Sequence, residues 1–370
     1  MSWLWFVAGL LMFAGLVLVH ELGHYLVARR NGVEVEEFGL GFPPRAMIIT
    51  KKKGTIYTLN WLPFGGFVRL KGEHDADRQK GTFGAASLWA KTKIMLAGVA
   101  MNLIVAFVLL TVLAVIGMPQ LLDNQFTVKS DTTVSRHEVL VGYVERDSPA
   151  AKADLKVRDQ LVSIGLPALP AVPITSQDQL PGLTKNLAGQ TVQVTVKRHG
   201  QTEVKSVSLR RTTDADKDKG YLGISPVDYS LQRSTWSAPL VAAGLVKQFT
   251  VTTLKGLGSL IAGVARGHGG QAAAQVTGPV GIVVLIKDNS FLGPQFTLLI
   301  VAVVSLTLAI MNALPIPAID GGRLFTILLH RLLRRPLTAE REELINGIGF
   351  VVLLLLIVVV TFIDLKRNFF

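Results

Sequence analysis

The chain has 370 residues and a formal net charge of +12, and 49% of its residues are hydrophobic against 17% that are charged. With a mean hydropathy of +0.43, this composition favours a membrane protein. No basic stretch is interleaved with aromatic residues, so the charge indicates attraction to a membrane surface and excludes a nucleic-acid groove. Cysteine is absent, which excludes disulfides and thiolate metal ligands.

Four apolar stretches have the length of about 20 residues that a bilayer requires. They cover residues 3–28, 92–118, 295–316 and 344–364. The first stretch lacks a basic start and a small-residue cleavage site, so it is not a cleaved signal peptide. The sequence therefore predicts a polytopic α-helical membrane protein with four transmembrane helices.

Loop charges predict the orientation of these helices. Residues 31–91 and 323–343 are rich in Lys and Arg, and with four spans they fall on the same side of the membrane. The positive-inside rule makes that side cytoplasmic. The long region 119–290 and both termini then face outward, because long domains are translocated largely regardless of their charge.

The inner end of the first stretch carries the sequence His20-Glu21-Leu22-Gly23-His24. Residues four apart share one face of a helix, so His20 and His24 can bind one zinc ion side by side. Glu21 is then placed to handle the proton of an attacking water. The alternative is three polar groups that only solvate a helix end. Ionisable groups in a membrane-length segment are costly, however, and are usually functional.

A third metal ligand is expected from another polar residue at membrane depth, because catalytic zinc usually has three protein ligands. The segment from Asn312 to Gly322, with the sequence NALPIPAIDGG, closes the third stretch. Its prolines break the helix and its glycines permit unusual backbone geometry around Asp320. Asp320 is therefore predicted as the third ligand, and the alternative is an N-cap of the next helix.

The paired motifs HELGH and NxxPxPxxDGG, about 300 residues apart, resemble those of the site-2 protease family of intramembrane zinc metalloproteases. The likeness is greatest to the RseP-type branch, the regulators of sigma-E protease. The resemblance implies that His20, His24 and Asp320 are zinc ligands and that Glu21 is the catalytic glutamate. It also implies that Asn312 and Pro315 handle the substrate. The family usually has Leu where this chain has Ile319, which is a conservative change.

The second stretch contains Gly98 and Asn102 in a pattern that resembles a further motif of the family. Asn102 is predicted to bind substrate by a hydrogen bond to a carbonyl, or to bond an active-site loop. The alternative is an interhelical hydrogen bond used for packing, with Gly98 allowing close approach. Both remain open at this point.

The first cytoplasmic loop is predicted to form a β-hairpin over residues 55–70. β-branched and aromatic residues lie on both sides of its Pro63-Phe64-Gly65-Gly66 sequence. This hairpin resembles the membrane-associated β-hairpin of the family. An unwound substrate segment can add to its edge as a strand, which makes Gly65 and Gly66 candidate substrate-binding residues. The alternative is a hairpin that only covers the zinc site from water.

Residues 137–212 are predicted to form the core of an inserted α+β domain. Strands are expected at 139–144, 159–164 and 191–196, and a turn with a short helix at 147–155. This order is similar to the circularly permuted PDZ domains of the family, which bind extended peptides by strand addition. There is room for only one such domain. The charged stretch 213–235 is expected to be a mobile link.

Residues 236–293 are predicted to form an amphipathic linker on the outer membrane face, with a fifth span as the alternative. The complete predicted order is 1–30 (first helix), 31–91 (cytoplasmic loop), 92–118 (second helix), 119–235 (PDZ domain and flanks), 236–293 (linker), 294–322 (third helix), 323–343 (cytoplasmic loop), 344–364 (fourth helix) and 365–370 (tail).

The resemblance implies a zinc metalloendopeptidase in the bacterial cytoplasmic (inner) membrane, with its PDZ domain extracytoplasmic. Its substrates would be transmembrane segments of single-span proteins, such as an anti-sigma factor or signal-peptide remnants, and its PDZ domain would bind peptide termini. The lipid bilayer is a further expected partner, and no nucleic-acid partner is expected. A proteolytically inactive PDZ scaffold is the alternative, but it would need a broken zinc or glutamate motif. A metal transporter would need further polar clusters along a path.

Overall fold

The computed structural model describes residues 2–122, 124–167, 169–198, 200–211, 220–267, 278–289 and 294–369. The chain forms two compact units. Unit 1 comprises Met1–Met118, Gln125–Val128 and Thr235–Phe370. Unit 2 comprises Pro119–Asn124 and Lys129–Ser234. Residues 212–219, 268–277 and 290–293, which belong in part to the predicted link and linker, lie outside the described residues.

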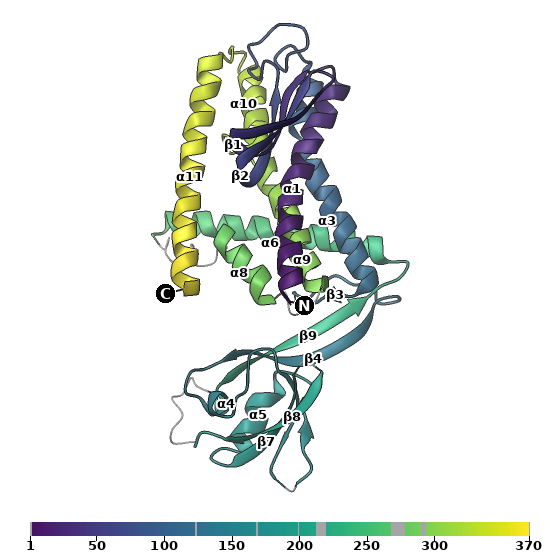
Figure 1. The fold of residues 1–370 in the computed structure, drawn as a ribbon, viewed down its shortest axis with the longest axis vertical. Helices are drawn as coiled ribbons and strands as arrows, with labels where there is room; N and C mark the ends of the chain where they lie inside the picture. Colours follow the sequence, from purple (N-terminus) through teal and green to yellow (C-terminus); the bar gives the residue numbers. More distant parts are fainter. Residues whose placement is uncertain are drawn as a thin grey trace. The chain divides into compact units, whose positions relative to one another are not determined.

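Unit 1 is built on long apolar helices. Among the described residues, four helices are long and apolar enough to cross a membrane. They are α1 (Ser2–Arg30), α3 (Ala97–Ile116), α9 (Pro294–Ala313) and α11 (Ala339–Phe369), and Figure 1 shows them. The prediction of a helical membrane protein with four apolar helices of spanning length is thereby confirmed.

The second predicted span is divided into two helices. Helix α2 (Leu88–Met95) begins at Ser87, whose side chain accepts a hydrogen bond from the Ala90 backbone nitrogen. At Leu96 the chain turns before α3 begins. Only α3 has the length and composition of a span, because α2 carries Lys91 and Lys93. The prediction of a single span over 92–118 did not separate the two helices, because the run of apolar residues continues across Leu96.

Helix α6 (Ala238–Ala265) packs against α3 and α9. Buried apolar residues of the three helices form one core, which consists of Leu110, Leu113, Ala114, Ala238, Val241, Ala242, Leu245, Leu299 and Ala302. Figure 1 shows α6 crossing the upright helices. Two shorter helices of unit 1, α8 (Pro279–Asn289) and α10 (Asp320–Leu332), precede α9 and follow it.

The loop that follows α1 forms a sheet, but not the predicted hairpin over 55–70. Strands β1 (Val35–Lys52) and β2 (Thr55–Leu70) are antiparallel and meet at a turn of Lys53 and Gly54. The first part of β1, residues 35–40, pairs with both 56–59 and 66–70. The two halves of the predicted hairpin therefore lie on either side of a third segment. The local pattern indicated strands and a bend correctly, but it could not reveal that partner.

In its described residues, unit 2 contains one sheet and two short helices. The sheet order is β3-β9-β4-β5-β7-β8, with β6 paired to β5. The strands are β3 (Met118–Pro119), β4 (Thr133–Val144), β5 (Gln160–Gly165), β6 (Val172–Pro173), β7 (Thr191–Arg198), β8 (Gln201–Ser208) and β9 (Ile224–Arg233). The helices are α4 (Pro149–Lys152) and α5 (Gln179–Asn186).

The core of unit 2 follows from alternation along its strands. Val192, Val194 and Val196 on β7 are all fully buried, while their neighbours face outward. The strands expected at 139–144 and 191–196 lie within β4 and β7, and the strand expected at 159–164 matches β5 except for Asp159, which precedes it. Strand β9, however, occupies much of the stretch that was expected to be a mobile link. It pairs with β4 from Thr133 to Val144, so this stretch belongs to the sheet.

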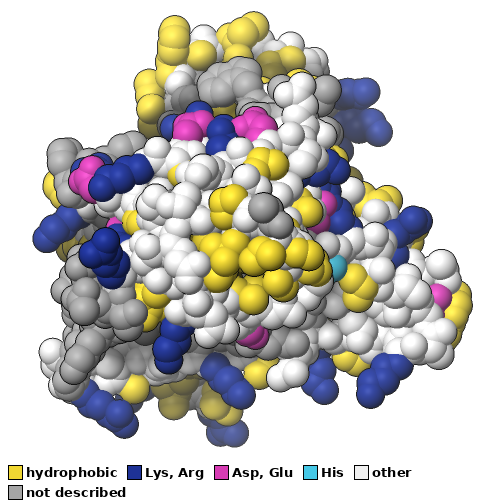
Figure 2. Space-filling model, turned by 90° about the horizontal axis from the view of Figure 1, so that it is seen from below, with side chains coloured by type: hydrophobic (Ala, Val, Ile, Leu, Met, Phe, Trp, Pro, Cys, Tyr) yellow, Lys and Arg dark blue, Asp and Glu magenta, His cyan; other side chains and the backbone are white. Residues whose placement is uncertain are grey.

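On the face that Figure 2 shows, the described Lys and Arg side chains are scattered around the periphery and an apolar patch lies between them. They do not form a continuous basic stripe on this face.

Candidate metal centre and active site

Three potential metal donors meet where α1 contacts the start of α10. His20 Nε2 lies 3.0 Å from Asp320 Oδ2, and His24 Nε2 lies 3.2 Å from the same oxygen. The two histidine Nε2 atoms are 3.2 Å apart. Both histidines are buried, so the cluster is largely shielded from solvent. Within the described residues this is the cluster of metal-donor side chains that the fold brings together.

The spacing of the three donor atoms fits zinc. With bonds of about 2.0–2.1 Å and tetrahedral angles, ligand atoms of one zinc ion lie roughly 3.3 Å apart. The three observed separations of 3.0 to 3.2 Å are close to that value. Two imidazoles and one carboxylate are also a donor set that zinc accepts in catalytic sites. The residues present therefore fit a zinc ion with one coordination position left for water or substrate.

Two glycines let α3 approach the histidine face of α1. A Cβ atom at Gly98 would lie 2.5 Å from His20 Cε1 and 2.5 Å from His24 Nε2. A Cβ atom at Gly23 would lie 2.6 Å from the Ala97 carbonyl oxygen. Any side chain at either position would separate the helices or displace the histidines, since real Cβ contacts are never this short.

The ring of His24 is oriented by the backbone. Its Nδ1 lies 2.8 Å from the carbonyl oxygen of Ile94, which can only accept a hydrogen bond. The proton of neutral His24 is therefore on Nδ1, and the lone pair of Nε2 points toward His20 and Asp320. Helix α2 thus contributes a fixed carbonyl, which is a common way to orient a metal-binding histidine.

The chain places Asp320 by a tight turn between α9 and α10. Ala318 adopts a positive φ of 76°. A Cβ atom at Gly321 would lie 2.5 Å from the Leu314 carbonyl oxygen, and one at Gly322 only 1.7 Å from the Ile316 carbonyl oxygen. The N-cap of α10 is Ile319, without a side-chain hydrogen bond. Asp320 is therefore not the helix cap, and its carboxylate faces the two histidines instead.

Glu21 lies beside the donor cluster and against strand β2. A Cβ atom at Gly66 would lie 3.5 Å from Glu21 Cγ, and the backbone of Val68 is within hydrogen-bonding reach of the carboxylate. The second half of the predicted hairpin segment therefore borders the glutamate. Gly65 is one residue away with a positive φ of 87°, and its missing side chain makes room for the ring of Phe42.

The remaining predicted site residues differ in their surroundings. Asn102 is buried and its side chain faces the ring of His20. The Asn312 side chain donates a 3.1 Å hydrogen bond to the Leu308 carbonyl of its own helix, and Pro315 is exposed. The structure thus groups Asn102 with the donors, whereas Asn312 and Pro315 lie on the chain segment that leads to Asp320.

A model of peptidase family M50 matches residues 8–356. The chain belongs to this family, the site-2 proteases. A protein of Clostridium acetobutylicum that is provisionally named a zinc metalloprotease is 31% identical to it over 369 residues, with 98% of each chain covered. The regulator of sigma-W protease RasP of Bacillus subtilis is 26% identical over 448 residues, and the zinc metalloprotease RasP of Geobacillus kaustophilus is 24% identical over 446, again with 98% of each chain covered.

This M50 peptidase is therefore an intramembrane zinc metalloprotease. Its family membership agrees with the resemblance found in the two paired motifs. Family membership also agrees with the geometry of the metal donors, in which His20 and Asp320 meet although they are 300 positions apart in sequence.

Some residues that support the site of the M50 peptidase were not predicted from sequence. The carbonyl of Ile94 orients His24, and Ser305 on α9 donates a 2.8 Å hydrogen bond to the backbone carbonyl of Asn102. A backbone carbonyl has no sequence signal. Ser305 could have been noticed as a lone hydroxyl in an apolar stretch, because such groups often bond a neighbouring helix.

The sheet that borders Glu21 is held together by a buried carboxylate. Glu37 on β1 accepts hydrogen bonds from Arg45 Nη2 at 2.8 Å and from the Thr58 hydroxyl at 2.8 Å, and it also pairs with Arg69. Burial raises the pKa of Glu37, but the hydrogen bonds from Thr58 and Arg45 and the charge of Arg69 outweigh burial and hold this pKa below its usual value. Glu37 thus links segments from both strands.

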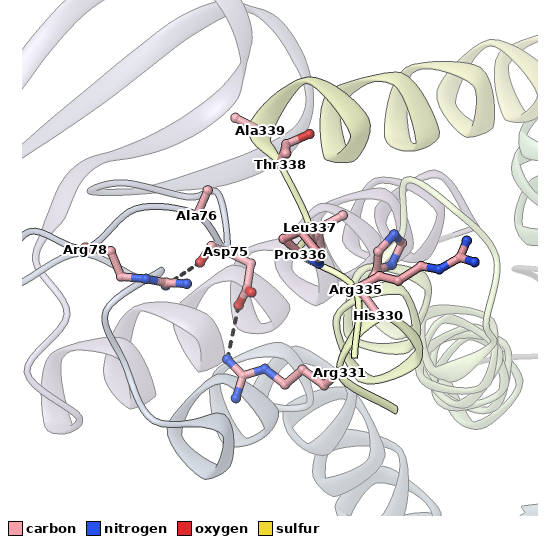
Figure 3. Close-up of a pocket in the computed structure, with 10 residues that line it drawn as sticks. All are labelled: Asp75, Ala76, Arg78, His330, Arg331, Arg335, Pro336, Leu337, Thr338 and Ala339. Atoms are coloured by element: carbon pink, nitrogen blue, oxygen red, sulfur yellow. Dashed lines mark hydrogen bonds and ion pairs between the residues drawn. The ribbon is translucent and has the colours of Figure 1, made fainter. Parts of the chain in front are cut away.

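A separate cavity of about 420 Å³ lies between the loop after β2 and the connection from α10 to α11. Figure 3 shows Arg78 and Arg331 extending toward Asp75. Arg78 donates a 2.6 Å hydrogen bond to the backbone carbonyl of Asp75. Arg331 lies 3.4 Å from the Asp75 carboxylate, and the buried Lys91 donates a hydrogen bond to the same carboxylate. Burial lowers the pKa of Lys91, and the Asp75 carboxylate offsets this only in part. These pairs fasten the loop to α10 and α2.

Proposed function

We propose that this M50 peptidase cleaves transmembrane segments of single-span proteins, with His20, His24 and Asp320 as zinc ligands and Glu21 as catalytic base. The observation that carries the proposal is the convergence of the three donors beside Glu21 on a helix of spanning length. Ionisable groups are expensive in such a segment and are retained there mainly for function.

Each proposed residue has a separate chemical task. Bound zinc polarises the scissile carbonyl and activates water. Glu21 accepts the proton of the attacking water and passes it to the leaving amine. His20, His24 and Asp320 would hold the metal, and the burial of the two histidines keeps other water away from the reacting bond.

The sheet of β1 and β2 supports a path for the substrate. A transmembrane substrate must unwind before its peptide bonds can be attacked, and an unwound segment can add to a strand edge. Residues 66–70 pair on one side with 35–40 and border Glu21 on α1. We place the substrate strand near Gly65 and Gly66, with Asn312 and Pro315 contacting it from the segment before Asp320. The sheet would then be membrane-associated.

Unit 2 is proposed to be a single circularly permuted PDZ domain that binds peptide termini on the extracytoplasmic side, as in the RseP-type branch. Its strand order and its two short helices are compatible with this assignment. The enzyme would be a multi-pass protein of the bacterial inner membrane. Its substrates would include anti-sigma factors already shortened on the outer side, or signal-peptide remnants.

A proteolytically inactive scaffold is less well supported. Such a protein would have no reason to keep a buried donor set whose spacing suits zinc, next to a glutamate. Burying these groups without a metal would cost stability.

The test compares two site variants and one control variant of the purified protein in detergent. Glu21→Gln should abolish cleavage of a spanning peptide but leave zinc bound, because Glu21 is not a ligand. Asp320→Asn should lower zinc content, measured by elemental analysis, whereas the control Asp154→Asn in unit 2 should not. Equal zinc in the two aspartate variants, or near-normal turnover by Glu21→Gln, would refute the assigned roles.

A further inference from the structure

Asn102 on α3 faces the side of the His20 ring that points away from Asp320. Its side-chain nitrogen lies 3.3 Å from His20 Nδ1, and the residue is only 1% exposed. The other amide atom, Oδ1, is buried and has no hydrogen-bond partner among the described residues. A substrate cannot reach a side chain enclosed in this way, so direct substrate binding by Asn102, one of the predictions from sequence, is disfavoured.

The chemistry of His20 decides which amide atom faces its ring. This step rests on the proposed function, in which His20 binds zinc through Nε2. A neutral imidazole that presents its Nε2 lone pair carries its proton on Nδ1. That proton needs an acceptor, and His24 already has one in the Ile94 carbonyl. At His20 the group within reach is the Asn102 amide.

The oxygen and nitrogen of an amide have nearly the same shape, and the hydrogen-bond network determines their assignment. In the orientation that the structure records, the amide nitrogen faces the ring and Oδ1 has no hydrogen-bond partner among the described residues. A proton on His20 Nδ1 requires the opposite orientation, because two hydrogen-bond donors do not pair. We infer that Asn102 is a positioning residue whose Oδ1 accepts the Nδ1 proton of His20, thereby fixing the tautomer and the ring orientation that zinc binding requires.

A second contact separates this role from simple helix packing. The hydrogen bond that joins α3 to α9 at this level is made by the Ser305 hydroxyl to the backbone carbonyl of Asn102. The link between α3 and α9 therefore does not use the side chain of Asn102. Gly98, one turn earlier, brings the same face of α3 against both histidines, which sets the distance between amide and ring.

The inference is tested by zinc affinity, measured by chelator competition on purified full-length protein. Asn102→Leu keeps the approximate volume but removes the acceptor, and it should weaken zinc binding about 10–100-fold, as is common when the partner of a metal-binding histidine is lost. Asn102→Asp offers two acceptor oxygens and no N–H donor, and it should bind zinc nearly as well as the wild type. Thr111→Val, further along α3, is the control and should have no effect.

The outcomes distinguish the inference from the zinc site itself. If Asn102→Asp loses as much affinity as Asn102→Leu, the amide acts as a donor or by packing, and the inference is wrong. If Asn102→Leu binds zinc normally while Asp320→Asn does not, the inference fails but the zinc site stands. If Asp320→Asn also binds normally, the proposed site fails. Thermal unfolding of the metal-free proteins checks folding, and Asn102→Ala replaces the leucine variant if that variant does not fold.

Discussion

At Gly98, a single hydrogen atom in place of a side chain decides whether the donors can meet. We expect Gly98→Ala to lower zinc content strongly, because the added methyl would lie 2.5 Å from atoms of both His20 and His24. Elemental analysis of the purified variant measures this. Gly15→Ala on α1 is the matched control, because a Cβ atom there meets nothing within 4 Å. If the Gly98→Ala protein contains as much zinc as the wild type, α3 can move away from the histidines of α1 without loss of zinc binding.

The donors themselves could be predicted from sequence because helical periodicity places His20 and His24 on one face, and because Asp320 follows a broken helix. The supporting contacts could not. Gly23 lies inside the recognised motif, yet its contact with the Ala97 carbonyl depends on how α3 crosses α1. The same holds for Ile94 and Ser305, whose roles arise only when separate helices meet.

Among the elements, the sheet of β1 and β2 departs most from the prediction. Residues 55–70 have the alternation and the central bend of a hairpin, which are local properties. Pairing of their two halves is excluded by residues 35–40, which lie between them. A sequence pattern shows which residues prefer a strand, but the choice of partner depends on non-local contacts such as the ion pairs of Glu37.

Those ion pairs predict a pH-dependent stability of the sheet. We expect Glu37→Gln to lower the free energy of unfolding by about 1–3 kcal/mol at pH 7, because a buried charge-assisted network is lost. The pKa of Glu37 is below its usual value in the folded protein. Its stabilising contribution is therefore present above the unfolded-state pKa of about 4.3 and disappears as pH falls through the folded-state pKa.

Denaturant unfolding of wild type and Glu37→Gln in detergent, followed by circular dichroism at several pH values, checks this. The difference between the two proteins should be greatest near pH 7 and shrink below about pH 4. A difference that stays constant on acidification would mean that the charge of Glu37 is not what stabilises the sheet.

For the molecule as a whole, the limits of unit 2 determine how its role can be tested. The core expected from sequence, 137–212, omits β9, and its removal would leave that strand without β4. Thr133 pairs with Arg233, and the hydroxyls of Thr132 and Ser234 are 2.8 Å apart. The insertion therefore begins and ends at neighbouring points. Residues 133–233 can be replaced by a short Gly-Ser turn without stretching the chain.

We expect this deletion to keep cleavage of a substrate already trimmed on its outer side, because the donors and Glu21 all belong to unit 1. We further propose that unit 2 excludes substrates with bulky outer domains, so the deletion should also permit cleavage of an untrimmed substrate that the intact enzyme rejects. Cleavage of both substrates by purified protein is the measurement. A folded, zinc-loaded deletion without any activity would show instead that unit 2 delivers the substrate.

The pairing of β4 with β9 also bears on the order in which the chain folds. Helices α3 and α6 share a core, although more than 100 residues separate them in sequence. Closing a loop of that length has an entropic cost that grows with the number of residues it contains. Once unit 2 has formed, its two ends are adjacent, and α6 can dock onto α3 as though only a short turn connected them. Mutations that weaken the β4–β9 ladder should therefore slow assembly of the helices, even though they lie in the other unit.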